Sequence, residues 1–122
     1  MKRYQNAIQK FGECEKRKCF KEWDKMTEKL IEVKRNKKRL EETEEHKRYA
    51  KCMTGCARSM EDVIKAMDLE LLRLLKEGGG KQGELKELRK ALEKFKNRDV
   101  TVKLMEDFLA IKEDFTKKVV HM

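Results

Sequence analysis

Residues 46–77 carry apolar side chains in alternating steps of four and three, and this pattern constrains the fold more than any other feature. The series is His46, Ala50, Met53, Ala57, Met60, Ile64, Met67, Leu71 and Leu74. Such steps keep side chains on one face of a helix, and we call this apolar face a seam. At about 1.5 Å per residue the helix would be roughly 48 Å long. Because its other face is polar, it must pack its seam against another helix.

The composition favours long, solvated helices with narrow seams. Charged residues make up 45% of the 122 residues, hydrophobic residues 39%, and proline is absent. We therefore expect an all-α fold in one domain, residues 1–122. No apolar run reaches the ~20 residues of a membrane span, and residues 1–10 lack the apolar block of a secretory signal. We expect a cytoplasmic or nuclear protein, or a secreted one if the chain is a mature fragment.

A first helical arm is predicted over residues 3–35. Its seam contains Tyr4, Ile8 and Phe11, followed by Cys19, Trp23, Met26, Leu30 and Val33. The step from Phe11 to Cys19 is eight residues rather than seven, and Gly12 lies within it. We expect a stutter or bend in this interval.

The seam nearly disappears over residues 34–48, where the chain either turns or continues as one helix. In the first alternative Asn36 ends the first arm, and the chain reverses into a second arm, residues 38–77, with an acidic first turn. In the second, strong helix formers continue one rod that pairs with another chain. We favour the turn, because the seams on the two sides do not share a register.

Three consecutive glycines, Gly78 to Gly80, predict the end of the second arm. A third arm follows over residues 84–120, with a kink or break near residues 97–99, where Asp99 is a candidate N-cap. Its seam residues are Leu85, Leu88, Leu92, Phe95, Leu104, Phe108, Ile111, Phe115 and Val119. Three arms of similar length predict an antiparallel up-down-up bundle or coiled coil.

The four cysteines fit this hairpin. Cys14 and Cys19 lie in the first arm, and Cys52 and Cys56 in the second. In an antiparallel pair of arms, Cys14 with Cys56 and Cys19 with Cys52 form nested pairs about a reversal near residue 35. That reversal coincides with the turn suggested by Asn36.

The state of the cysteines is open at this stage. The absence of a signal sequence favours reduced thiols, while the nested pairs are compatible with two disulfides. A zinc site is the third alternative. It is disfavoured because a five-residue step separates Cys14 and Cys19 by about 140° around a helix.

Positive charge is concentrated in the first third of the chain. Residues 1–39 contain 14 Lys and Arg against 6 Asp and Glu, a net of +8 out of +9 for the whole chain. A basic patch of Lys34, Arg35, Lys37, Lys38 and Arg39 lies at the expected hairpin tip. This patch is typical of a solvated turn, and it also suggests a nucleic-acid contact.

No motif of base, nucleophile, metal ligands or phosphate loop stands out, so we expect no enzyme activity and no cofactor. The function predicted is binding of another protein, as an adaptor, scaffold or assembly subunit, and a homo-oligomer is equally compatible with the seams. The expected core or interface residues are Trp23, Met26, Leu30, Met53, Met60, Ile64, Leu71, Leu88, Phe108 and Phe115. The alternatives are a nucleic-acid binder and a secreted, disulfide-stapled effector.

Overall fold

The computed structural model describes residues 2–36, 39–78, 82–96 and 99–120, and within these it is all-helical with no strand. The first arm is helix α1 (Lys2–Arg35). The second consists of the short 3₁₀ helix η1 (Leu40–Glu42), α2 (Glu44–Met53), the 3₁₀ turn η2 (Thr54–Cys56) and α3 (Ala57–Glu77). The all-α prediction is confirmed for the described residues.

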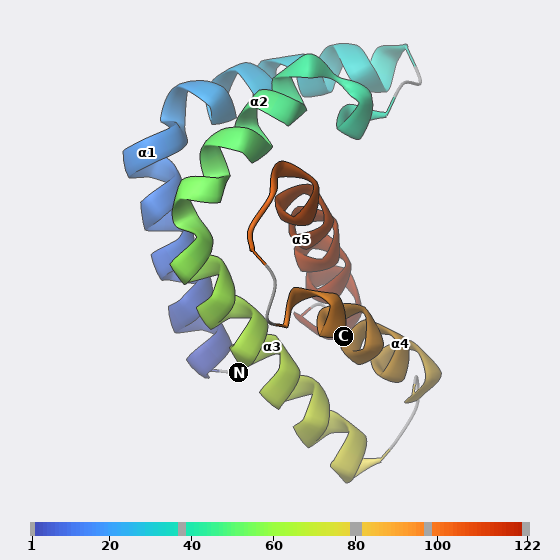
Figure 1. Cartoon of the computed structure of the whole chain (residues 1–122). Coiled ribbons are helices and arrows are strands. Elements are labelled where there is room, and N and C mark those ends of the chain that lie inside the picture. The colour runs from blue at the N-terminus through green and yellow to red at the C-terminus, as the bar shows by residue number, and fades with distance from the viewer. Residues whose placement is uncertain (1, 37–38, 79–81, 97–98, 121–122) are drawn as a thin grey trace.

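The first two arms form a bent antiparallel hairpin, and the described helices that follow Gly78 lie inside the bend (Figure 1). This second layer contains α4 (Gln82–Leu92), η3 (Glu93–Phe95), α5 (Val102–Phe115) and a final π-helical turn η4 (Thr116–Val120). Helix α4 packs on α3, and α5 packs on α2. The predicted third arm is thus divided into two helices, and an up-down-up bundle of three long arms is not confirmed.

The bend of the hairpin has a local origin in both arms. Helix α1 leaves helical geometry at Cys19, where φ is −129° and ψ is 25°. The second arm departs from it at η2, whose last residue Cys56 has φ −105° and ψ 26°. Lys18 Nζ donates a hydrogen bond of 3.0 Å to the Gly55 carbonyl oxygen, so this carbonyl at the break in the second arm has a hydrogen-bond partner. The bend predicted near Gly12 lies instead at the end of the interval, at Cys19.

Helix boundaries follow ordinary capping rules. Thr43 begins α2, with its side-chain oxygen accepting from the His46 backbone N–H, and Glu44 and Glu45 form the acidic first turn. Thr101 caps α5 in the same way, accepting from Leu104, so the expected cap at Asp99 is wrong by two residues. The stop at Gly78 is as expected, because its φ of 74° suits a glycine.

The core lies between the hairpin and the second layer. Aromatic contacts join the two ends of the chain: Phe11 lies 5.2 Å from Phe108, and Tyr4 lies 4.7 Å from Phe115, measured between ring centroids. The methionines of the second arm, Met53, Met60 and Met67, are fully buried. Among the predicted seam residues, Leu71, Leu88, Phe108 and Phe115 are also buried, and Met26 and Ile64 are half-buried against the core.

Two ion pairs support the second layer. Arg89 Nε of α4 lies 3.1 Å from Asp68 Oδ1 of α3, and Lys94 Nζ of η3 lies 3.5 Å from Asp107 Oδ2 of α5. Both pairs are partly exposed, so each contributes less than about 1 kcal/mol. The position of α4 and α5 therefore depends mainly on apolar burial.

Candidate protein-interaction surface

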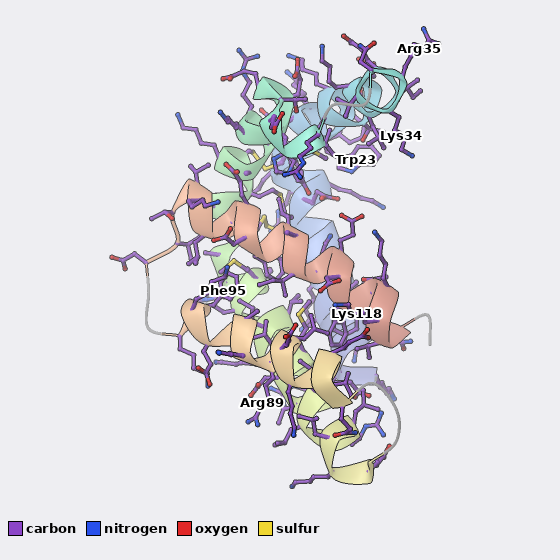
Figure 2. All side chains as sticks on the ribbon, turned by 90° about the vertical axis from the view of Figure 1, so that its right-hand side faces the viewer. Trp23, Lys34, Arg35, Arg89, Phe95 and Lys118 are labelled. Atoms are coloured by element: carbon purple, nitrogen blue, oxygen red, sulfur yellow. A yellow bond between two sulfur atoms is a disulfide. The ribbon has the colours of Figure 1, made fainter. Side chains whose placement is uncertain are left out.

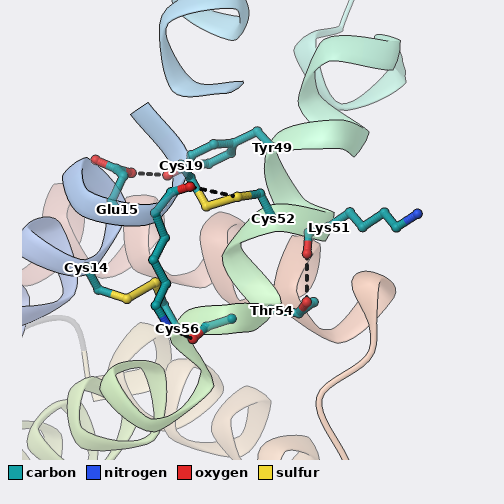
Figure 3. Close-up of a disulfide and its surroundings, with 10 residues drawn as sticks. Cys14, Glu15, Cys19, Tyr49, Lys51, Cys52, Thr54 and Cys56 are labelled. Carbon is teal, nitrogen blue, oxygen red and sulfur yellow. Dashed lines mark hydrogen bonds between the residues drawn. A yellow bond between two sulfur atoms is a disulfide. The ribbon is translucent and has the colours of Figure 1, made fainter. Parts of the chain in front are cut away.

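The predicted cysteine pairs meet between α1 and the second arm. Cys14 lies at disulfide distance from Cys56, and Cys19 from Cys52, with Cα–Cα separations of 6.1 and 5.9 Å (Figure 3). Both pairs are drawn as disulfides, and the described residues contain no free cysteine. Cys52 Sγ also contacts the Lys18 carbonyl oxygen at 3.4 Å. Each cross-link includes a residue of the bend, Cys56 in one and Cys19 in the other, and together they fix α1 against α2 and η2.

Beyond the disulfides, α1 presents an exposed apolar stripe that we define as Phe20, Trp23 and Ile31. Their exposed fractions are 56%, 37% and 69%, so Trp23, which its spacing predicted as a core or interface residue, lies at the surface. The Phe20 and Trp23 rings lie 6.2 Å apart and line a small hollow with Glu15 and Lys16. Leu30, on the same half of α1, is half-buried.

Trp23 also forms one edge of an open groove between α1, α2 and α5, with a volume of about 630 Å³. The apolar side chains that line it are Trp23, Met26, Leu40 and Leu109. Its volume lies in the range of ligand pockets, and its lining is mixed, because the other residues that line it are Glu15, His46, Tyr49, Lys112, Glu113, Thr116 and Lys117.

Polar groups of unusual environment line the same groove. Tyr49 is buried, and its phenol donates a hydrogen bond to the Glu15 carboxylate (Figure 3). Burial, followed by the bond to Glu15, raises the pKa of Tyr49 well above its ordinary value. His46 is 7% exposed, and its Nδ1 has no hydrogen-bond partner within the described part of the chain.

Lys112 supplies a positive charge to the groove. Its ammonium lies 5.4 Å from the centroid of the Phe11 ring and forms no ion pair with a described carboxylate. Burial lowers the pKa of Lys112, while the charges of Glu15 and Glu113 oppose this change. An anionic group entering the groove would stabilise this ammonium.

The basic patch predicted at the tip is only partly described. Lys34, Arg35 and Arg39 are exposed, and Figure 2 shows the first two at the far end of α1, beyond Trp23. Lys37 and Lys38 lie outside the described residues. Carboxylates surround the tip, because Arg39 shares a surface groove with Glu32, Glu42, Glu44 and Glu45. The tip is therefore a mixed-charge surface.

The sequence pattern did not predict the groove, because its walls come from segments far apart in the chain. A search of the described ranges finds no cluster of three or more His, Cys, Asp or Glu side chains able to hold a metal. No described helix is long and apolar enough to cross a bilayer. Comparison with protein-family models, curated proteins and solved structures gives no match.

Proposed function

We propose that this protein is a non-enzymatic binding protein whose bent hairpin docks an acidic, amphipathic helix of another protein. The observation that carries the proposal is the exposed pair Phe20 and Trp23 at the edge of the apolar groove. Aromatic side chains exposed beside a pocket are enriched in the energetic centres of protein interfaces.

Charge complementarity supports an acidic partner. The first third of the chain has a net charge of +8. Lys16 lines the hollow beside Phe20, and Lys112 and Lys117 line the groove, where Glu15 and Glu113 offset part of this charge. An acidic polar face on the partner helix would pair with these groups while its apolar face covers Trp23. A partner with a basic polar face would be repelled.

Trp23 offers a direct test, because it is the single tryptophan of the chain. An amphipathic peptide with an acidic polar face should shift Trp23 emission to shorter wavelength as it covers the ring. The same peptide with lysines in place of its acids should bind more weakly. The Phe20→Ala variant keeps the reporter and should lower affinity by about tenfold, the range of an interface aromatic. Leu69→Ala is the matched control, since Leu69 is 47% exposed on α3.

Capture of native partners on the wild type and the two variants is the second part of the test. Proteins retained by the wild type and by Leu69→Ala, but lost with Phe20→Ala, support the proposal. If both variants retain the same proteins, the stripe is not the binding surface. If all partners disappear after nuclease treatment, the protein-binding proposal is wrong.

The two alternative functions receive unequal support. A nucleic-acid contact through the tip is disfavoured by the carboxylates of Glu32, Glu42 and Glu44 around it. The secreted, disulfide-stapled effector is supported by the two cysteine pairs, because disulfides persist mainly in oxidising compartments. Secretion is compatible with helix docking, so it extends the main proposal rather than replacing it.

A further inference from the structure

A second hollow lies on another flank of the hairpin, with a volume of about 490 Å³. Lys21 and Lys25 of α1 and Arg48 and Lys51 of α2 line it, and we call these four side chains the basic basin. Lys21 and Lys25 lie two residues before and after Trp23, which places them roughly 160° around α1 from that ring. The basin is therefore separate from the groove that docks the partner helix.

The cations of the basin are held together by the cross-linked hairpin. Cys52 lines the hollow, and its pairing with Cys19 fixes α1 to α2 at this point. Within the described part of the chain, none of the four cations lies within ion-pair distance of a carboxylate. Because the four like charges repel one another, an anion bound between them would gain attraction and relieve this repulsion.

The charges around the basin limit the size of such an anion. Glu22 and Glu45 also line the hollow, so its net charge is +2. Towards the tip, Glu45 borders the acidic groove that contains Glu42 and Glu44. An extended polyanion lying along the hairpin would meet these carboxylates, whereas a compact one would contact only the cations.

The chemistry of the four cations favours phosphate groups. The planar guanidinium of Arg48 can donate two parallel hydrogen bonds to one phosphate. Lys21 and Lys25 add point charges from the facing helix α1, and Lys51 adds one from α2. We propose that the basic basin binds a compact oligophosphate, either a free ligand or the headgroup of a phosphorylated lipid. This site does not depend on the proposed docking of a partner helix.

Calorimetric titration with inorganic tripolyphosphate tests the proposal. Binding should weaken as salt is added, because exposed charges are screened within about 10 Å at 0.1 M ionic strength. The double variant Lys21→Gln/Arg48→Gln should bind about tenfold more weakly or worse. Lys34→Gln/Arg35→Gln removes the same charge at the tip and should change affinity less than about twofold. All four residues are exposed, and circular dichroism checks that each variant keeps its helices.

Further measurements distinguish a lipid headgroup from a free ligand, and binding at the basic basin from binding at the tip. Retention on vesicles of a bisphosphorylated lipid, but not on vesicles of a singly charged lipid, would assign the phosphates to a headgroup. Tripolyphosphate binding without vesicle binding would assign them to a free ligand. The proposal is overturned if tripolyphosphate does not bind, or if both double variants lose affinity equally. It is also overturned if a short oligonucleotide binds more tightly than tripolyphosphate and loses affinity equally in the basin and tip double variants. Phe20→Ala should leave tripolyphosphate affinity unchanged.

Discussion

Tyr49 of α2 donates a hydrogen bond to Glu15 of α1, and both residues line the groove beside Trp23. The phenol is buried, and its neutral form is favoured by burial and by donation to the Glu15 carboxylate, which together raise the pKa of Tyr49. A buried hydrogen bond to a charged acceptor contributes more than an average one. Tyr49 therefore stabilises the hairpin and also holds Glu15 in a fixed position beside Lys112.

Replacing Tyr49 by Phe should lower the free energy of unfolding by about 1–3 kcal/mol at neutral pH, since Glu15 loses its donor. Because the pKa is raised on folding, the unfolded chain releases the Tyr49 proton near pH 10.0, before the folded chain does. The stabilisation by Tyr49 is therefore complete below that pH and is lost as pH rises above it. In urea denaturation, the difference in free energy of unfolding between wild type and Tyr49→Phe should be smaller at about pH 11 than at about pH 8.

Tyr4→Phe serves as the matched control. Tyr4 is also buried, but its neighbouring polar group is the Thr116 hydroxyl rather than a carboxylate. Tyr4→Phe should lower the free energy of unfolding less than Tyr49→Phe does at neutral pH. Equal costs for the two substitutions would contradict the role given to the bond with Glu15.

At the scale of the elements, the two glycines Gly12 and Gly78 have opposite roles. Gly12 lies inside regular α1, and a methyl group added there would meet nothing within 4 Å. Gly78 ends α3 with φ 74° and ψ −175°, a backbone conformation that side chains strongly disfavour. The same substitution should therefore change stability in opposite directions.

Gly12→Ala should raise the free energy of unfolding by about 0.5–1 kcal/mol, because alanine loses less backbone entropy in a helix. Gly78→Ala should lower it by about 1–3 kcal/mol, because the residue is strained. Chemical denaturation measures both. A loss of stability with Gly12→Ala would show that this glycine is needed for a bend, as the interrupted seam first suggested.

The spacing of apolar residues predicted the helices well, because this spacing can be read directly from the sequence. The reversal after Arg35, the stop at Gly78 and the pairing of Cys14 with Cys56 all follow from it. The eight-residue step from Phe11 to Cys19 predicted a bend, but the spacing did not show that the bend lies at Cys19 rather than near Gly12. The heptad spacing left Trp23 as a core or an interface residue, because it shows which face of a helix a residue occupies but not where the partner helix ends.

At the scale of the whole molecule, the structure has one covalently joined layer and one layer held by packing. The cysteine pairs span 42 and 33 residues of the hairpin, whereas α4 and α5 contain no cysteine. Disulfides stabilise mainly by restricting the unfolded chain, and each typically contributes about 2–4 kcal/mol. The hairpin should therefore remain the more stable layer.

Titration of thiols in the unfolded protein without reductant should find none reactive, and four after reduction. Reduction should lower the free energy of unfolding by about 2–4 kcal/mol for each bridge broken. A Cys14→Ala/Cys56→Ala variant should show about one bridge's share of that loss. Four reactive thiols before any reductant is added would contradict both the disulfides and the oxidising compartment.

The aromatic contacts between the two ends of the chain have a consequence for synthesis on the ribosome. Tyr4 and Phe11 leave the exit tunnel well before the rings that cover them, Phe115 and Phe108. Until then, a nascent hairpin carries an uncovered apolar face that chaperones or proteases can engage. Quality control of this protein would thus act as a check that translation has reached α5.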